Sequence, residues 1–283
     1  MTMLADTEAR YDVRIEDVEY QRQAGRPLLA RLYRPAGAGP FPAALQIHGG
    51  AWTSKDRTDN DFMAKALAES GILIASIDFR MPPEAGYPAT LADINLAIRW
   101  LKARAGHYGS RADRVGCFGT SSGGHLALLA AMRPFDARYA TLPLAEAPQT
   151  DARLAFVISA WGVLDPLLRY GLAKAAGNAG LVGNHDAFWG SEAAMRDGSP
   201  PAILASGERI ELPPAFLFQG DADEWVPTDV AQRLVAAWRK AGGEIELMLF
   251  PEAMHGFMTG KPDAPHAGAA LAAMKRFIHR HAS

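Results

Sequence analysis

A serine between two glycines is the first place in this sequence where chemistry is expected. Residues 119–123 read Gly-Thr-Ser-Ser-Gly, which fits the pattern G-x-S-x-G. The apolar run 115–118 precedes it, and the helix-like segment after it carries Leu126 and Leu129 on one face. A strand that turns abruptly into a helix exposes the hydroxyl of its turn residue beside a helix N-terminus, where backbone N–H groups stabilise negative charge. The pattern therefore predicts a nucleophilic serine.

Two adjacent serines compete for this role. With Ser121 at the turn, the residues two before and two after it are Gly119 and Gly123, both without bulk. With Ser122 at the turn, the earlier position would be Thr120, whose branched side chain crowds a tight turn. We therefore predict that Ser121 is the nucleophile.

A serine hydroxyl needs a base to accept its proton, and histidine is the usual base. Among the eight histidines, His255 is the best placed, because it follows the last predicted strand within the loop 251–257. His125 lies one helical turn after Ser121, so we expect it to pack inside its helix or to bond a neighbouring loop. His255 is our predicted base.

The base in turn needs an acid that holds its imidazole in one tautomer. Asp221 and Asp223 both follow the predicted strand 215–218, and alternate residues at a strand end can reach the same side. We favour Asp223, which starts the segment Asp-x-x-Val-Pro ahead of a predicted helix, and Asp221 stays open as the competitor. The chain order is then serine, aspartate, histidine.

A glycine-bearing loop offers donors for a developing oxyanion. Residues 48–52 read His-Gly-Gly-Ala-Trp directly after a predicted strand, and small residues there let backbone N–H groups approach a substrate carbonyl. The predicted donors are the backbone N–H groups of Gly50, Ala51 and Ser122, with Gly49 as second choice. Asp78 and Glu84 invite a paired-carboxylate interpretation, but Asp78 is expected to anchor its own loop.

The elements that position these residues alternate between strands and helices. The expected strands are 13–20, 28–33, 43–47, 72–77, 115–118, 154–159, 215–218 and 245–250, with a hairpin turn at 23–26; the expected helices are 59–70, 88–105, 123 onward, 229–241 and 266–279. This alternation predicts an α/β fold with a mostly parallel sheet, an antiparallel N-terminal hairpin and helices on both faces. Ligands of such sheets bind beyond the carboxyl ends of the strands, which is where His48, Ser121, Asp223 and His255 fall.

One segment is too long to be a simple crossover between strands. Residues 163–212 exceed the length that one crossover helix and compact loops require, so they predict an insertion that forms a lid or cap over the site. Trp52, next to the oxyanion loop, is expected to bind substrate by narrowing the pocket from the other side. The chain is otherwise expected to be a single domain, 1–283.

Composition excludes several functional classes. The 283 residues are 49% hydrophobic and 21% charged with a net charge of −2, which gives no electrostatic basis for binding nucleic acid or an anionic membrane. Residues 1–12 lack the apolar run of a signal peptide, and no apolar run is long enough to span a bilayer. The single cysteine, Cys117, suits a cytoplasmic protein and is expected to fill core space. Metal-ligand spacing and phosphate-binding glycine loops are absent from the sequence, so we expect neither a metal nor a cofactor.

Five motifs together carry a resemblance to a known superfamily. They are H-G-G-A-W (48–52), D-F-R-M-P-P-E-A-G-Y-P-A (78–89), G-T-S-S-G-G-H-L-A (119–127), G-D-A-D-E-W-V-P (220–227) and H-G-F (255–257). With them the chain resembles an α/β-hydrolase of the esterase/lipase group near hormone-sensitive lipase, from about residue 12 to the end. It departs from that group at Ala51 and Trp52 and at Thr120 and Ser122. There it is similar to bacterial arylformamidase-like and feruloyl-esterase-like relatives, and the large N-terminal helical cap is expected to be absent.

The resemblance implies a serine carboxylesterase that cleaves small-molecule esters through an acyl-enzyme. Arylformamidase and small serine peptidase activities remain alternatives within the same fold, and a non-catalytic ligand-binding protein is an alternative from another class. Because such binding proteins usually lose a member of the triad and all three candidates are present here, we favour the enzyme. The sequence leaves the oligomeric state open, with a homodimer as one option.

Overall fold

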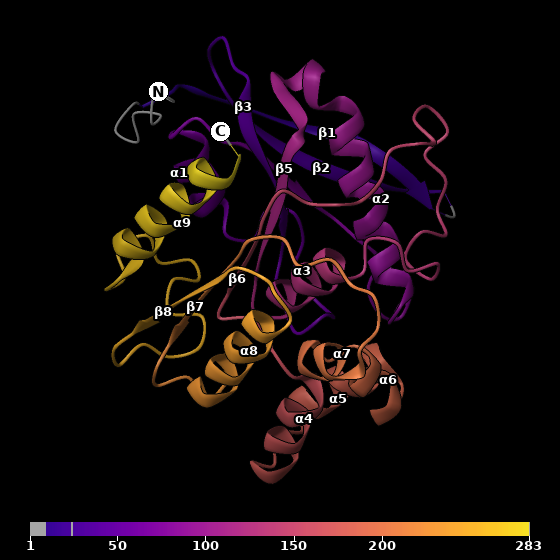
Figure 1. The fold of residues 1–283 in the computed structure, drawn as a ribbon, viewed down its shortest axis with the longest axis vertical. Coiled ribbons are helices and arrows are strands. Elements are labelled where there is room, and N and C mark those ends of the chain that lie inside the picture. Colours follow the sequence, from indigo (N-terminus) through magenta and orange to yellow (C-terminus); the bar gives the residue numbers. More distant parts are fainter. Residues whose placement is uncertain (1–9, 24, 283) are drawn as a thin grey trace.

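A single sheet runs through the middle of the molecule (Figure 1). The computed structural model describes residues 10–23 and 25–282, and in this part of the chain the sheet has eight strands. Their order across the sheet is β1 (Val13–Gln23), β2 (Arg26–Pro35), β4 (Leu73–Ile77), β3 (Phe41–Ile47), β5 (Ser110–Thr120), β6 (Val157–Ala160), β7 (Ala215–Gly220) and β8 (Ile245–Phe250). β2 is antiparallel to both β1 and β4, and all neighbours from β4 to β8 are parallel. The predicted sheet with its antiparallel hairpin is confirmed.

Helices cover both faces of this sheet. They are α1 (Asp61–Ala68), α2 (Ala89–Arg104), a 3-10 turn (Ala105–Tyr108), α3 (Ser122–Met132), α4 (Pro166–Ala175), α5 (Ala179–Trp189), α6 (Glu192–Asp197), α7 (Pro200–Ser206), α8 (Thr228–Lys240) and α9 (Ala267–Ala282). One hydrophobic core joins the sheet to α2, α3 and α8, and a second core joins the other face to α1 and α9. Successive strand residues divide between them: Leu217 lies in the first core, and Phe216 and Phe218 lie in the second. This is the period-two alternation of a sheet buried on both sides.

The observed helices and strands differ from the predicted ones mainly at their ends. The helix expected over 88–105 forms α2, and its side chains Leu91, Ile94, Ile98 and Leu101 are fully buried. β5 begins at Ser110, five residues before the predicted apolar run, because Ser110 pairs with Phe41 of β3 ahead of an irregularity in the register. β6 begins only at Val157. The predicted turn at 23–26 includes Ala24, and the segment tested for a targeting signal includes residues 1–9; these positions lie outside the described residues.

The parallel register brings the carboxyl ends of several strands to one edge. Ile47 pairs with Gly119 at the ends of β3 and β5, and Gly220 pairs with Phe250 at the ends of β7 and β8. Each of these strands is followed by a segment that carries a predicted catalytic residue or oxyanion donor. The fold therefore gathers segments that are up to two hundred residues apart in sequence.

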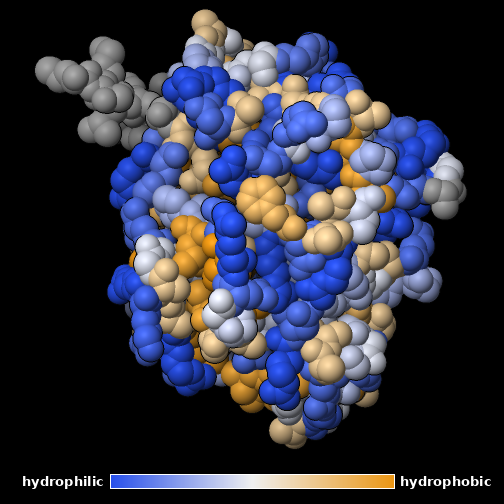
Figure 2. Space-filling view, turned by 45° about the vertical axis from the view of Figure 1, so that its right-hand side comes forward, coloured by the Kyte–Doolittle hydropathy of each residue, from blue (hydrophilic) through white to orange (hydrophobic). Residues whose placement is uncertain are grey.

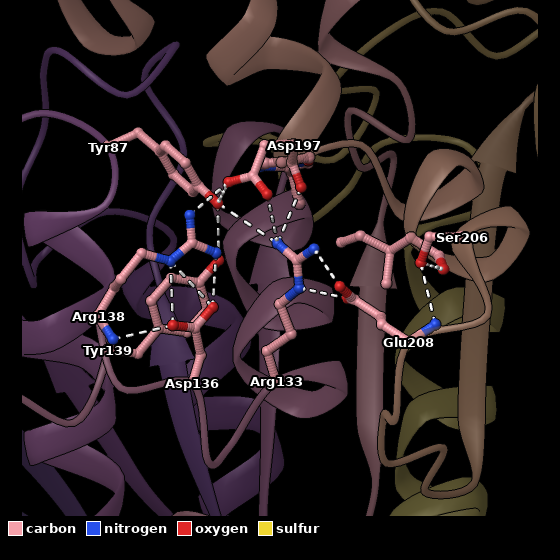
Figure 3. A network of polar contacts seen from close by, with 11 residues as sticks. Tyr87, Arg133, Asp136, Arg138, Tyr139, Asp197, Ser206 and Glu208 are labelled. Carbon is pink, nitrogen blue, oxygen red and sulfur yellow. Dashed lines mark hydrogen bonds and ion pairs between the residues drawn. The ribbon is translucent and has the colours of Figure 1, made fainter.

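The predicted insertion, 163–212, folds into the four helices α4 to α7 between β6 and β7 (Figure 1). A polar network ties its second half to the chain that follows α3 (Figure 3). Arg133 donates to both carboxylate oxygens of Glu208, at 2.6 and 3.0 Å, and to the carbonyl of Asp197 at 2.8 Å. Arg138 donates to the Asp197 carboxylate at 2.7 Å, and the Tyr87 hydroxyl also donates to it. These contacts fix this part of the insertion to the domain.

One face of the molecule is mainly hydrophilic (Figure 2). Figure 2 shows one face on which blue, hydrophilic side chains dominate and hydrophobic ones gather in smaller areas. Among the described residues, no helix is both long enough and apolar enough to pass through a bilayer.

Replacing Arg133 tests how strongly the network holds the insertion. The Arg133 side chain is only 8% exposed, so Arg133→Met leaves Glu208 and Asp197 without their buried partner and should lower the free energy of unfolding by about 3 kcal/mol. Urea denaturation measures this difference. Arg233→Met, which removes an exposed pair with Asp229, is the control and should cost less than about 1 kcal/mol. Equal losses in the two variants would contradict the buried anchor.

Candidate active site

Ser121 occupies a strained turn between β5 and α3. Its backbone has φ 53° and ψ −121°, a conformation that non-glycine residues rarely adopt. A Cβ atom on Gly119 would lie 2.2 Å from the carbonyl oxygen of Gly123, and one on Gly123 would lie 2.2 Å from that of Ile47. Both flanking positions therefore require glycine, because any side chain would push the turn apart.

The three side chains predicted for proton transfer lie together. Ser121 Oγ is 2.8 Å from His255 Nε2, and His255 Nδ1 is 2.8 Å from Asp223 Oδ2. The other carboxylate oxygen of Asp223 accepts hydrogen bonds from the backbone of Trp225 and Val226, at 2.9 and 3.0 Å. The Asp223 side chain is fully buried, so its negative charge is held by these donors and by the imidazole. This geometry can remove a proton from the serine hydroxyl.

Asp221, the competing acid, lies elsewhere. Its carboxylate accepts a hydrogen bond from the backbone N–H of Glu252 at 2.6 Å. Asp221 thus ties the end of β7 to the loop that carries His255, while Asp223 contacts the imidazole itself. Of these two carboxylates, Asp223 is the one within hydrogen-bonding distance of the His255 ring.

The loop after β3 holds its backbone in left-handed conformations. Gly50, Ala51 and Trp52 have φ values of 95°, 51° and 65°. A side chain on Gly50 would meet the carbonyl oxygen of Ser54 at 2.2 Å. The N–H of Trp52 donates to the buried Ser122 hydroxyl at 3.1 Å, so the second serine of the elbow anchors this loop. Within the described residues, the N–H groups of Gly50 and Ala51 donate no hydrogen bond.

His48 supports the loop that follows β3. Its Nδ1 lies 2.9 Å from the carbonyl oxygen of Gly49, and its ring stacks on Phe79 with centroids 4.2 Å apart. Burial lowers the pKa of His48, which favours the neutral form of the ring. Asp78 was expected to anchor its own loop, but its carboxylate accepts hydrogen bonds from the backbone and side chain of Arg57, in the loop after β3.

A cavity of about 630 Å³ opens over the serine. Its lining comes from the loop after β3, the elbow, the loops after β6 to β8 and the insertion. The insertion contributes Arg169, Asn178, Gly180, Leu181 and Asn184. Among these, Asn184 accepts a hydrogen bond from Thr53 at 3.1 Å, which joins the insertion to the loop after β3.

Trp52 lies behind the cavity wall and not on it. Its side chain is fully buried, stacks on Phe188 at 5.4 Å and meets His125, His185 and Trp189 edge-on. A buried indole cannot narrow the pocket by direct contact. Trp52 shapes the pocket by supporting the residues that line the cavity.

His125 and Cys117 are core residues. His125 Nε2 lies 2.7 Å from the carbonyl oxygen of Gly198, which is the bond to a neighbouring loop that we expected. Burial lowers the pKa of His125 to about 4. Burial raises the pKa of the Cys117 thiol, so this cysteine stays protonated as a small core side chain.

Sequence reasoning missed Arg169, a buried cationic residue in the cavity lining. Lys55 also lines the cavity, but it pairs with Asp59 at 2.8 Å. It lies on the buried face of α4, where Pro166 and Ala173 are the other buried residues. The available signal was a charged residue at the helical spacing shared by the inward-facing Pro166 and Ala173. The sequence pattern also did not indicate that Glu244, Glu246 and His281 lie close together beside β8. There Glu246 pairs with Arg280, and Glu244 pairs with His281.

The sheet, the elbow and the placement of these residues define an α/β-hydrolase fold. The chain belongs to the BD-FAE family, whose model matches residues 31–238. It is 28% identical over 249 residues to the probable carboxylic ester hydrolase LipM of Mycobacterium tuberculosis, covering 82% of this chain and 53% of LipM. The chain thus spans about half the length of that relative.

Two further proteins match over most of their length. The carboxylesterase NlhH of Mycobacterium tuberculosis is 28% identical over 278 residues, covering 95% of this chain and 84% of NlhH. Thermogutta terrifontis esterase 2, in a structure phosphonylated by cyclosarin, is 25% identical with a TM-score of 0.71, covering 93% of this chain and 91% of that one. Both of these relatives are named as esterases.

Covalent labelling by a fluorophosphonate tests the acid. Asp223→Asn presents an amide to His255 and favours the wrong imidazole tautomer, so the second-order labelling rate should fall by about a thousandfold. Asp221→Asn is the matched control, and because the Asp221 carboxylate bonds the Glu252 backbone and not the imidazole, the rate should fall by less than about tenfold. The reverse ranking would assign the orienting role to Asp221.

The buried His125 predicts a loss of stability in acid. Its pKa is about 4 in the folded state and about 6.5 in the unfolded state. Between these values only the unfolded chain takes up the proton, so the free energy of unfolding should fall by about 3 kcal/mol as pH drops from 6.5 to 4. In His125→Gln the decline, measured by urea denaturation, should be shallower by that amount. Substitution of the exposed His107 by Gln should leave the decline unchanged, and a decline equally steep in His125→Gln would contradict the assignment.

Proposed function

We propose that this protein is a serine carboxylesterase that hydrolyses short-acyl esters through an acyl-enzyme. The observation that carries the proposal is the continuous hydrogen-bonded chain from Ser121 through His255 to Asp223 at the floor of a cavity. The esterase names of LipM, NlhH and the Thermogutta enzyme support the same reaction class.

In the proposed mechanism, Ser121 Oγ attacks the ester carbonyl carbon while its proton passes to His255 Nε2. The buried carboxylate of Asp223 stabilises the imidazolium that forms. The imidazolium then protonates the departing alkoxide, and the carbon–oxygen bond breaks to leave an acyl-serine. A water molecule, deprotonated by the same imidazole, releases the acid and restores the serine.

The oxyanion formed in both steps needs preorganised donors. Gly50 and Ala51 line the cavity with N–H groups that find no partner in the described residues, and Ser122 starts α3, where the first N–H groups of a helix are free. The Ser122 hydroxyl holds the loop through Trp52, so the donors from the two sides of the site are fixed relative to each other. We assign the oxyanion hole to these three N–H groups.

Cavity size and a fixed cover favour small substrates. A volume of about 630 Å³ lies within the usual range of small-molecule pockets. The insertion lines the cavity as a cover, and the anchor at Arg133 holds its second half in place, so activation at a lipid interface is not expected.

A series of 4-nitrophenyl esters from acetate to palmitate tests the proposal. Each added methylene that the pocket can bury contributes about 0.8 kcal/mol, or roughly fourfold in kcat/KM, until the pocket is full. We expect kcat/KM to peak at or before butyrate and to be far lower for esters of twelve or more carbons. A rise that continues through laurate and palmitate would identify a lipase instead.

Two serine variants and two other substrates complete this test. Ser121→Ala should abolish hydrolysis, whereas Ser122→Ala should keep measurable activity because it removes only a loop anchor. An inactive Ser122→Ala with an active Ser121→Ala would overturn the assignment. Higher kcat/KM on N-formylkynurenine or on an aminoacyl anilide than on a short aryl ester would identify an arylformamidase or a peptidase. Failure of the protein to react with a fluorophosphonate would identify a non-catalytic binding protein.

A further inference from the structure

The insertion places a buried positive charge beside the candidate active site. Arg169 is 5% exposed and sits at the centre of the inward face of α4. Burial lowers its pKa to about 10, so the guanidinium remains charged at neutral pH. Burying a cation is costly unless another charge or set of acceptors compensates it. A position that suits an apolar residue therefore holds the most strongly basic side chain.

No acidic side chain pairs with this cation in the part of the chain that the structure describes. Its Nε and Nη1 atoms are enclosed and donate no hydrogen bond, which leaves Nη2 as the nitrogen that can face the cavity. Asp223 is close enough to influence Arg169 electrostatically, but its oxygens are already taken by His255 and by two backbone N–H groups. The charge thus lacks a fixed partner.

The surroundings hold the guanidinium without neutralising it. It lies over the ring of Trp52, 5.3 Å from the ring centroid, which gives a cation–π contact. His125 and His185 also contact Trp52, and burial lowers the pKa of each to about 4, so both rings are neutral. Arg169 is therefore preorganised on an aromatic support, with its positive charge available to a ligand.

The cavity wall shows where that ligand would lie. Arg169 lines the same cavity as Ser121 and His255, so a molecule whose ester carbonyl is at the serine can place a second group near the guanidinium. Guanidinium groups bind carboxylates through short, charge-assisted hydrogen bonds. We propose that Arg169 binds a carboxylate carried by the substrate, so that the preferred esters of this enzyme are anionic. The proposal rests on the esterase function proposed above and specifies its substrate class.

Matched pairs of esters test the proposal on either side of the scissile bond. On the acyl side, the mono-4-nitrophenyl ester of glutaric acid is compared with 4-nitrophenyl pentanoate. On the alcohol side, 4-acetoxybenzoate is compared with 4-acetoxybenzamide. For each pair the readout is the ratio of kcat/KM for the anionic ester to kcat/KM for the neutral one, which cancels general losses of activity.

In Arg169→Met we expect this ratio to fall by about thirtyfold in at least one pair, the effect of losing a hydrogen bond to a charged group. The pair that responds identifies the side of the ester that carries the carboxylate. Arg169→Lys should recover part of the ratio. Lys174→Met, which removes an exposed cation from the same helix, should leave it unchanged. Ratios that are the same in wild type and Arg169→Met for both pairs would overturn the proposal.

The pH profile on the neutral ester separates binding from positioning. If Arg169 served only to tune Asp223 and His255, Arg169→Met would shift the acidic limb of kcat/KM without changing the ratios, and the proposal would be wrong. Circular dichroism checks the fold, and Arg169→Gln replaces the Met variant if that variant is unfolded.

A binding measurement keeps this proposal distinct from the esterase function. If the wild type hydrolyses none of the four esters, the esterase function fails, and calorimetric titration with glutarate and with benzoate then decides the role of Arg169. Saturable binding of either anion that Arg169→Met abolishes would support the carboxylate site. Identical titrations for wild type and variant would overturn it.

Discussion

The structure depends on one close approach of backbone to backbone at the elbow. Gly119 and Gly123 allow β5 to turn into α3 beneath the end of β3, in a space where a single methyl group would lie 2.2 Å from a carbonyl oxygen. This contact forces Ser121 into its positive φ and puts the start of α3 under the loop that carries Gly50. The strain at one residue is balanced by the packing of two cores against the same sheet.

From that point the site is built by hydrogen bonds that cross between strand ends. The Ser122 hydroxyl holds the loop after β3, Asp221 holds the loop after β8, and Asp223 is itself held by the backbone that follows it. Two of the proposed catalytic side chains, Ser121 and Asp223, thus have a neighbour of the same residue type whose side chain holds a loop. In the first pair, the Ser121 hydroxyl contacts His255 and the Ser122 hydroxyl holds the loop after β3. In the second pair, Asp223 contacts the imidazole and Asp221 holds the loop after β8.

Much of this arrangement was predictable, and the reasons are local. The elbow was predictable because only glycine fits at its flanks, and the parallel sheet was predictable because apolar runs alternate with amphipathic helices. The positions of Trp52 and Arg169 were not. Their roles depend on how the helices of the insertion pack onto the loop after β3, and no short-range pattern records a contact between residues more than a hundred positions apart. A bulky aromatic beside a glycine loop suggested a pocket wall, whereas tertiary packing made it a buried support.

The proposed catalytic residues and many of the pocket-lining residues come from different parts of the chain, and this affects how such a protein can change in evolution. Ser121, His255 and Asp223 all come from loops directly after strands of the sheet, while α4 and α5 bring their own side chains to the cavity. The insertion is continuous in sequence and is fastened to the domain by its own contacts at Glu208 and Asp197. Evolution can therefore rewrite the helices between β6 and β7, and with them the choice of substrate, while the inherited reaction chemistry stays intact.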